Sequence, residues 1–153
     1  MQTTDVIIVG AGSAGLTLAL LLAQAEHSSQ LQITVLDQGA EPAASTPSLQ
    51  RVSALNLASE RLLQQLGVWS ALVAKPAYQA MQVWEADSFA RIEFDAISEG
   101  QHALGFMVDN EELRQQLYQK AKSHPQIQCR FGVRITQIPV SYTHLTLPTK
   151  RIV

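Results

Sequence analysis

The chain has 153 residues, of which 46% are hydrophobic and 16% are charged, and its formal net charge is −2. A chain of this length can bury one sizeable core, so we expect a single domain. The charged fraction is below the ~25% typical of soluble domains, which argues against a disordered segment. Without a basic surplus, nucleic acid is not expected as a partner. The His, Cys, Asp and Glu residues lack metal-ligand spacing, so no metal site is predicted.

The first fifty residues contain neither Lys nor Arg, because the first basic residue of the chain is Arg51. Secretory and mitochondrial leader segments need basic residues, so the sequence predicts a cytoplasmic protein. The uncharged stretch Val6–Ala25 is long enough to cross a bilayer. Its glycines, its β-branched start and the lack of a basic flank argue against a transmembrane segment, and none is predicted.

Residues 5–37 show the pattern of a β-α-β unit. The β-branched run Val6–Val9 predicts a strand, residues 10–15 a turn of small residues, and Leu16–Ala25 a helix. A second strand is predicted over Ile33–Leu36. This order predicts an α/β fold of the Rossmann-like type with a parallel sheet.

The turn fits the pattern G-x-G-x-x-G between a strand and a helix, which is where this dinucleotide-binding motif is expected. In such a turn Gly10 permits the tight bend, Gly12 lets a pyrophosphate approach the backbone, and Gly15 lets the helix pack on the sheet. The helix N-terminus adds N–H groups and positive potential. The candidate cofactor-binding residues of this loop are Gly10, Ala11, Gly12, Ser13, Ala14 and Gly15.

Asp37 completes the candidate site, and Gln38 next to it is included. Asp37 lies 22 residues after Gly15, at the end of the second strand, where a carboxylate can accept hydrogen bonds from ribose hydroxyls. An acidic residue there disfavours a 2′-phosphate. The motif therefore predicts FAD or NAD rather than NADP, and it leaves the choice between those two open.

The later residue patterns predict further segments in chain order. They are a loop over 38–50, a helix over 53–66, a small hairpin of strands over 81–85 and 90–95, a helix over 111–123, and strands over 127–131 and 133–138. Either Asp109 or Asn110 is suited to cap the last helix. The hairpin is expected to lie outside the parallel sheet as an insertion.

Several short segments, in this order, resemble the N-terminal half of the ubiquinone-biosynthesis hydroxylases, which are FAD-dependent aromatic monooxygenases. They are Gly10–Gly15, Arg51–Asn56, Leu66–Trp69, Met81–Trp84 and Met107–Asn110. The stretch Val83–Phe89 is similar to the 2-polyprenylphenol hydroxylase branch. The sister branch that acts on demethoxyubiquinol remains open.

The resemblance implies bound FAD and three further contacts to it. It places Arg51 against the flavin cofactor, Asn110 as a polar contact at the start of a helix, and the backbone of Val133 near the adenine. A guanidinium offers a planar fork of donors to phosphate or flavin oxygens, which suits Arg51 to this role independently. The alternatives are a surface arginine at position 51 and a simple helix cap at position 110.

The resemblance also implies the activity of the whole enzyme. It would use FAD, O₂ and NAD(P)H as a transient reductant to hydroxylate a lipid-like polyprenylphenol, with other ubiquinone-biosynthesis proteins as partners and the inner membrane surface as a second location. The rest of the FAD and substrate domains would follow later in the family's chain. No catalytic residue is assigned, and this fragment alone is expected to be inactive. An NAD-dependent Rossmann dehydrogenase fragment and a truncated domain without activity are the alternatives.

Residues 141–153 depart from the pattern of the preceding chain. The segment Ser141–Thr149 resembles the translation of a transposon-end sequencing adapter. We therefore expect residues 1–140 to be the N-terminal part of an FAD-binding monooxygenase domain and residues 141–153 to be a non-native tail. The alternative is a genuine edge strand followed by a basic end. Without this tail the net charge is −4.

Overall fold

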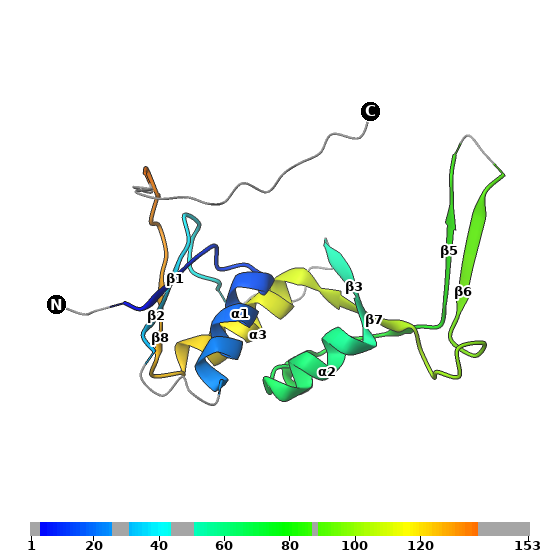
Figure 1. Ribbon diagram of the computed structural model, residues 1–153, viewed down its shortest axis with the longest axis horizontal. Helices are drawn as coiled ribbons and strands as arrows, with labels where there is room; N and C mark the ends of the chain where they lie inside the picture. Colours follow the sequence, from blue (N-terminus) through cyan, green and yellow to red (C-terminus); the bar gives the residue numbers. More distant parts are fainter. Residues whose placement is uncertain (1–3, 26–30, 44–50, 87–88, 138–153) are drawn as a thin grey trace.

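The computed structural model of the chain describes residues 4–25, 31–43, 51–86 and 89–137. The predicted tail over 141–153 and part of the predicted loop over 38–50 lie outside these ranges. The elements, labelled in Figure 1, are β1 (Val6–Val9), α1 (Ser13–Gln24), β2 (Ile33–Leu36), β3 (Val52–Asn56), α2 (Leu57–Gln65), the 3₁₀ helix η1 (Trp69–Ala71), β4 (Ala77–Tyr78), β5 (Ala80–Trp84), β6 (Arg91–Asp95), β7 (Gly105–Asp109), α3 (Asn110–Lys122) and β8 (Ile127–Arg130).

A parallel sheet in the order β1-β2-β8 is the centre of the fold. Val6 of β1 pairs with Ile33 of β2, which in turn pairs with Ile127 of β8. Helices α1 and α3 contact each other and lie together beside this sheet (Figure 1). The predicted β-α-β unit and the parallel sheet are therefore confirmed.

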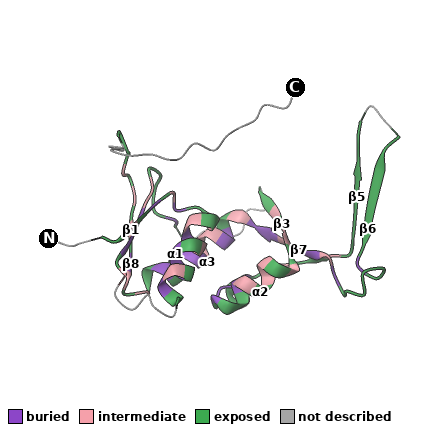
Figure 2. Cartoon of the chain, in the orientation of Figure 1, coloured by how far each residue is buried: buried purple, intermediate pink, exposed green. Residues whose placement is uncertain are grey.

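The core fills the space between this sheet and the two helices. Leu16 and Leu20 of α1 and Leu117 of α3 have no exposed surface, and they pack with Ile33 and Val35 of β2. Because strand side chains alternate between the two faces of a sheet, the face of β1 that points away from the core bears the exposed side chains of Ile7 and Val9, at 61% and 63% relative exposure. Figure 2 shows buried and exposed positions along the same elements.

A second sheet, in the order β3-β7-β4, is antiparallel and was not predicted. The predicted helix over 53–66 is wrong in its first part, because residues 52–56 form β3 and pair with β7, with Leu55 opposite Phe106. The helix begins only at Leu57. Asn56 is its N-cap, and its side-chain oxygen accepts a hydrogen bond from the Ser59 N–H at 2.9 Å.

The predicted hairpin is confirmed as β5 and β6, which pair antiparallel with Met81 opposite Phe94. Their two-stranded sheet is separate from the parallel sheet, as expected for an insertion (Figure 1). All described positions of both strands are exposed (Figure 2), and Trp84 retains 69% of its surface.

The predicted strand over 133–138 is wrong for the part that the structure describes. Residues 133–137 form neither helix nor strand there, and Ile138 lies outside the described ranges. Gly132 has φ +69°, a left-handed conformation that interrupts the extended run after β8. The predicted strand over 127–131 is confirmed with a one-residue shorter end.

The uncharged stretch Val6–Ala25 divides into β1, the glycine turn and the twelve-residue helix α1. Throughout the ranges that the structure describes, every helix is too short or too polar to cross a membrane. Helix α3 closely matches the predicted helix over 111–123, and Asp109 is its cap: one carboxylate oxygen accepts hydrogen bonds from the N–H groups of Glu111 and Glu112, both at 2.9 Å.

Candidate dinucleotide site

The glycine turn has the backbone geometry that the motif predicts at both of its ends. Gly10 has φ +105°, which L-residues with a side chain rarely adopt, and its N–H donates to the Leu36 carbonyl at 2.7 Å. A Cβ atom placed on Gly15 would lie 2.0 Å from the Gly10 carbonyl oxygen. The first turn of α1 therefore packs directly on the end of β1, at a distance that only glycine allows.

Gly12, the N-cap of α1, faces open space. Its backbone is extended, with φ −81° and ψ 179°, and no heavy atom of the described residues lies within 4 Å of an added Cβ. Ser13 and Ala14 form the first turn that follows. Because the first N–H groups of a helix lack intrahelical acceptors, this open turn offers backbone donors to an anion.

The side chain of Asp37 connects the glycine turn to the end of β2. Oδ2 accepts a hydrogen bond from the Ala11 N–H and Oδ1 accepts one from the Gly39 N–H, both at 2.7 Å. Burial opposes ionisation of this carboxyl, but the two backbone donors and the nearby charge of Arg114 outweigh burial and lower its pKa below the ordinary value. Asp37 is therefore a carboxylate at neutral pH.

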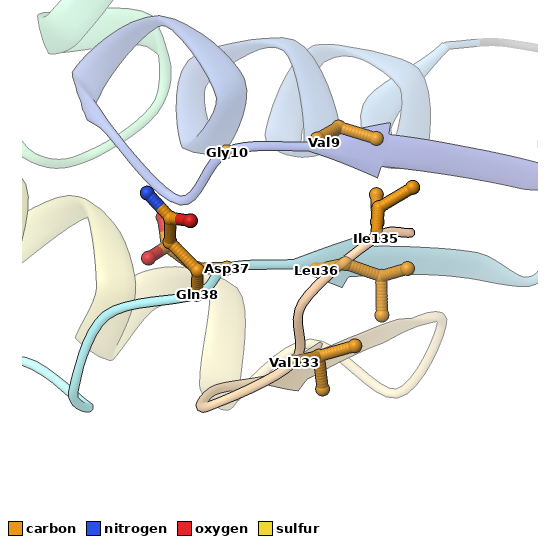
Figure 3. Close-up of a pocket in the computed structure, with 7 residues that line it drawn as sticks. All are labelled: Val9, Gly10, Leu36, Asp37, Gln38, Val133 and Ile135. Carbon is orange, nitrogen blue, oxygen red and sulfur yellow. The ribbon is translucent and has the colours of Figure 1, made fainter. Parts of the chain in front are cut away.

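A cavity of about 370 Å³ lies beside Asp37. The N–H of Val133 donates to the Asp37 carbonyl at 3.0 Å, which holds Val133 at the wall of this cavity. Four of the predicted site residues meet here, and they come from three separate segments of the sequence. The cavity, shown in Figure 3, is lined by Val9, Gly10, Leu36, Asp37, Gln38, Val133 and Ile135.

Arg51 and Asn110, two of the residues that the resemblance places against the cofactor, are neighbours in the structure. The Asn110 N–H donates to the Arg51 carbonyl at 2.9 Å, because β3 and β7 pair with Val52 opposite Asp109. The Arg51 side chain is exposed. Asp109, not Asn110, caps α3, so the capping alternative for Asn110 is wrong.

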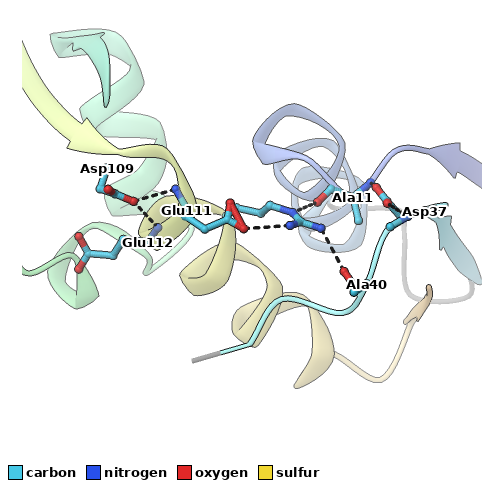
Figure 4. A network of polar contacts seen from close by, with 8 residues as sticks. Ala11, Asp37, Ala40, Asp109, Glu111 and Glu112 are labelled. Atoms are coloured by element: carbon cyan, nitrogen blue, oxygen red, sulfur yellow. Dashed lines mark hydrogen bonds and ion pairs between the residues drawn. The ribbon is translucent and has the colours of Figure 1, made fainter. Parts of the chain in front are cut away.

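Arg114 also contacts this site, and no local sequence pattern predicts that it does. Its Nε donates to the Ala11 carbonyl at 2.9 Å, and Figure 4 labels Ala11 together with Asp37 and Ala40. Arg114 also lies one helical turn after Asn110, about 6 Å along the helix axis. Arg114 and Ala11 are 103 residues apart in the chain, so local sequence patterns could not reveal their contact. Helix α3 thus connects the glycine turn to the pair formed by Arg51 and Asn110.

The arrangement suits the ADP half of a dinucleotide. The open position at Gly12 is where a pyrophosphate could approach, and the Asp37 carboxylate lies beside the glycine turn, where a ribose would be expected. Val133 lies beside Asp37, where an adenine would follow the ribose. Among the residues that the structure describes, no three His, Cys, Asp or Glu side chains are grouped so that they could hold a metal ion.

A sequence profile identifies the class of protein that this fold and site define. It matches residues 3–144, and the chain belongs to the FAD binding domain family. FAD is therefore the cofactor of this domain, which decides between the two dinucleotides that the motif left open.

The curated relatives narrow the family further. The 3-demethoxyubiquinol 3-hydroxylase of Escherichia coli K12 is 40% identical over 134 residues, which are 84% of this chain and 33% of that protein. The mitochondrial ubiquinone biosynthesis monooxygenase COQ6 of Xenopus tropicalis is 34% identical over 113 residues, which are 70% of this chain and 24% of that protein. These relatives confirm the resemblance to the ubiquinone-biosynthesis hydroxylases. The chain spans about a third or less of their length.

Solved structures confirm the fold. PqsL from Pseudomonas aeruginosa superposes with a TM-score of 0.65 at 19% identity, over 89% of this chain and 35% of that one. The p-nitrophenol 4-monooxygenase PnpA from Pseudomonas putida superposes with a TM-score of 0.56 at 16% identity, over 86% of this chain and 32% of that one. The predicted α/β FAD-binding fold is thus confirmed.

Proposed function

We propose that this chain supplies the ADP-binding part of the FAD site in an aromatic hydroxylase of ubiquinone biosynthesis. The observation that carries the proposal is the joining of Asp37 to the glycine turn through the Ala11 N–H, in a chain of the FAD binding domain family. The domain is proposed to extend over residues 1–140, with 141–153 as a non-native tail.

The residues of the chain have distinct tasks in this proposal. Gly12 and the first turn of α1 receive the pyrophosphate through backbone N–H groups. Asp37 accepts hydrogen bonds from the ribose, and Val133 lies beside the adenine. Arg51 and Asn110 hold the cofactor nearer its flavin end. FAD, when bound, supplies the redox and oxygen chemistry of the hydroxylation.

The proposed substrate is a lipid-like phenol with a polyprenyl tail, and NAD(P)H is the proposed reductant. The sequence similarity over residues 83–89 favours the 2-polyprenylphenol branch, while the relative from Escherichia coli acts, by its name, on demethoxyubiquinol. A polyprenyl substrate resides in lipid, so we propose that the cytoplasmic enzyme works at the membrane surface, alongside other proteins of the pathway.

The activity is tested with a protein of the relatives' full length that contains residues 1–140. Incubation with FAD, NAD(P)H, ¹⁸O₂ and either a polyprenylphenol or a demethoxyubiquinol is expected to add one labelled oxygen to the ring, detected by mass spectrometry. The substrate that gains the label identifies the branch. Flavin reduction without any labelled product from either substrate would contradict the proposed hydroxylase.

Arg51→Ala is expected to weaken FAD binding while the thermal unfolding temperature stays unchanged. A hydrogen bond to a charged group contributes about 1.5–3 kcal/mol, so the FAD dissociation constant should rise roughly 10- to 150-fold. The Arg51 side chain is exposed, and surface substitutions rarely alter stability. Fluorescence titration measures the affinity, and ADP serves as the control ligand. Unchanged FAD affinity would mean that Arg51 is only a surface residue.

A further inference from the structure

Three side chains of α3 point their polar groups at segments of the candidate site. Arg114, Tyr118 and Lys122 are spaced by four residues, which places them on one side of the helix. Arg114 Nε donates to the Ala11 carbonyl at 2.9 Å. Its Nη2 donates to the Ala40 carbonyl at 3.5 Å, beyond the end of β2. One guanidinium therefore contacts both the glycine turn and the loop that follows Asp37.

The C-terminal part of the same face of α3 contacts that loop as well. The Tyr118 hydroxyl donates to Glu41, and Lys122 Nζ donates to the same carboxylate oxygen at 2.9 Å. The Tyr118 ring packs edge-on against Phe131, with 5.2 Å between ring centroids. Tyr118 as a whole is buried, so its ring is packed within the fold.

The contact of Arg114 with Ala11 determines where the next N–H group points. A trans peptide is planar, and its C=O and N–H lie on opposite sides. The Ala11 carbonyl shares its peptide plane with the Gly12 N–H. Because that carbonyl is directed at Arg114, the Gly12 N–H is directed away from α3. Asp37 fixes the preceding plane in the same manner, through the Ala11 N–H at 2.7 Å.

We propose that Arg114 is a positioning residue of the dinucleotide site: by holding the Ala11 carbonyl it keeps the Gly12 N–H turned toward the pyrophosphate. Tyr118 and Lys122 hold the loop after Asp37 through Glu41 in support of the same geometry. Arg114 also forms an ion pair with Glu111 at 3.1 Å, which leaves its guanidinium less free to swing onto a phosphate. This inference rests on one part of the proposed function, the binding of the ADP half of the cofactor.

The test compares Arg114→Gln and Arg114→Lys with Arg61→Gln, an exposed arginine of α2, in the full chain. Dissociation constants for ADP and for FAD are measured by titration, and unfolding temperatures are measured without ligand. Arg114→Gln should weaken ADP and FAD binding by the same factor, about tenfold, as the loss of one orienting hydrogen bond predicts. Arg114→Lys should remain weakened, because an ammonium cannot span two carbonyls as the guanidinium does. Arg61→Gln should change neither affinity.

Several results would overturn the positioning role. Full affinity in Arg114→Lys would show that only the positive charge matters. Unchanged affinities in Arg114→Gln would show that the contact with Ala11 has no effect on binding. Should Arg114→Gln not fold, Arg114→Lys and Tyr118→Phe still decide, since Tyr118→Phe keeps the ring packing and should weaken ADP binding a few-fold. A parent chain that binds neither ADP nor FAD would overturn both the proposed function and this inference.

Discussion

Gly15→Ala is expected to destabilise the domain and to abolish FAD binding. The new methyl group would lie 2.0 Å from the Gly10 carbonyl oxygen, so either α1 or the end of β1 must move. Overpacking against backbone costs about 3 kcal/mol. For a domain of this size that corresponds to a fall of roughly 10 °C in unfolding temperature. Circular dichroism on heating measures this fall.

Gly12→Ala is the matched control within the same turn. The added methyl group meets open space among the described residues, and φ −81° is favourable for alanine, so the unfolding temperature should be unchanged. FAD affinity should nevertheless fall roughly 5- to 150-fold, because a methyl group in the path of the pyrophosphate costs about 1–3 kcal/mol. Equal stability losses in the two variants would contradict the assignment of Gly15 to packing and Gly12 to binding.

Asp37→Asn is expected to weaken FAD binding roughly tenfold or more. The amide keeps one oxygen acceptor but turns its NH₂ group toward a backbone donor, either Ala11 or Gly39. The charged acceptor for the ribose is also lost, and a hydrogen bond to a charged group contributes about 1.5–3 kcal/mol. Fluorescence titration with FAD measures the change. Wild-type affinity in Asp37→Asn would contradict the ribose contact.

The same variant tests the pH dependence of stability. The pKa of Asp37 in the folded chain is below its ordinary value of 3.8, because backbone donors and Arg114 outweigh burial. The ionised carboxylate therefore stabilises the fold above pH 3.8, and this contribution is lost as the pH falls through the lower, folded pKa. Urea unfolding should show that the free energy of unfolding of the wild type falls over this acidic range. The fall should be smaller in Asp37→Asn. An equal loss in both would contradict the role of Asp37.

The parts of the fold that local patterns specify were predictable. The β-branched run Val6–Val9, the glycine turn and Asp37 follow one another within a single β-α-β unit, so their spacing alone predicted that Asp37 lies beside the turn. The hairpin β5–β6 was predictable for the same reason, since its two strands are close together in the sequence.

The parts that depend on distant pairing were not predictable. Leu55 has helical spacing to Leu62, but its pairing with Phe106 makes residues 52–56 a strand. Tertiary pairing of this kind overrides local propensity. Arg114 was missed likewise, because its partners Ala11 and Ala40 come from other segments of the chain. The predicted strand over 133–138 failed, in the part that the structure describes, for a local reason, the left-handed Gly132 that precedes it.

The central claim is that Asp37 and the glycine turn form an FAD site. Its most direct test is to titrate the purified chain with FAD and with NAD⁺, and to repeat both titrations with Gly12→Ala. We predict saturable FAD binding with a bound-flavin absorption spectrum, much weaker NAD⁺ binding, and loss of FAD affinity in Gly12→Ala. A chain that binds NAD⁺ more tightly than FAD, or that binds FAD equally well after Gly12→Ala, would contradict the account.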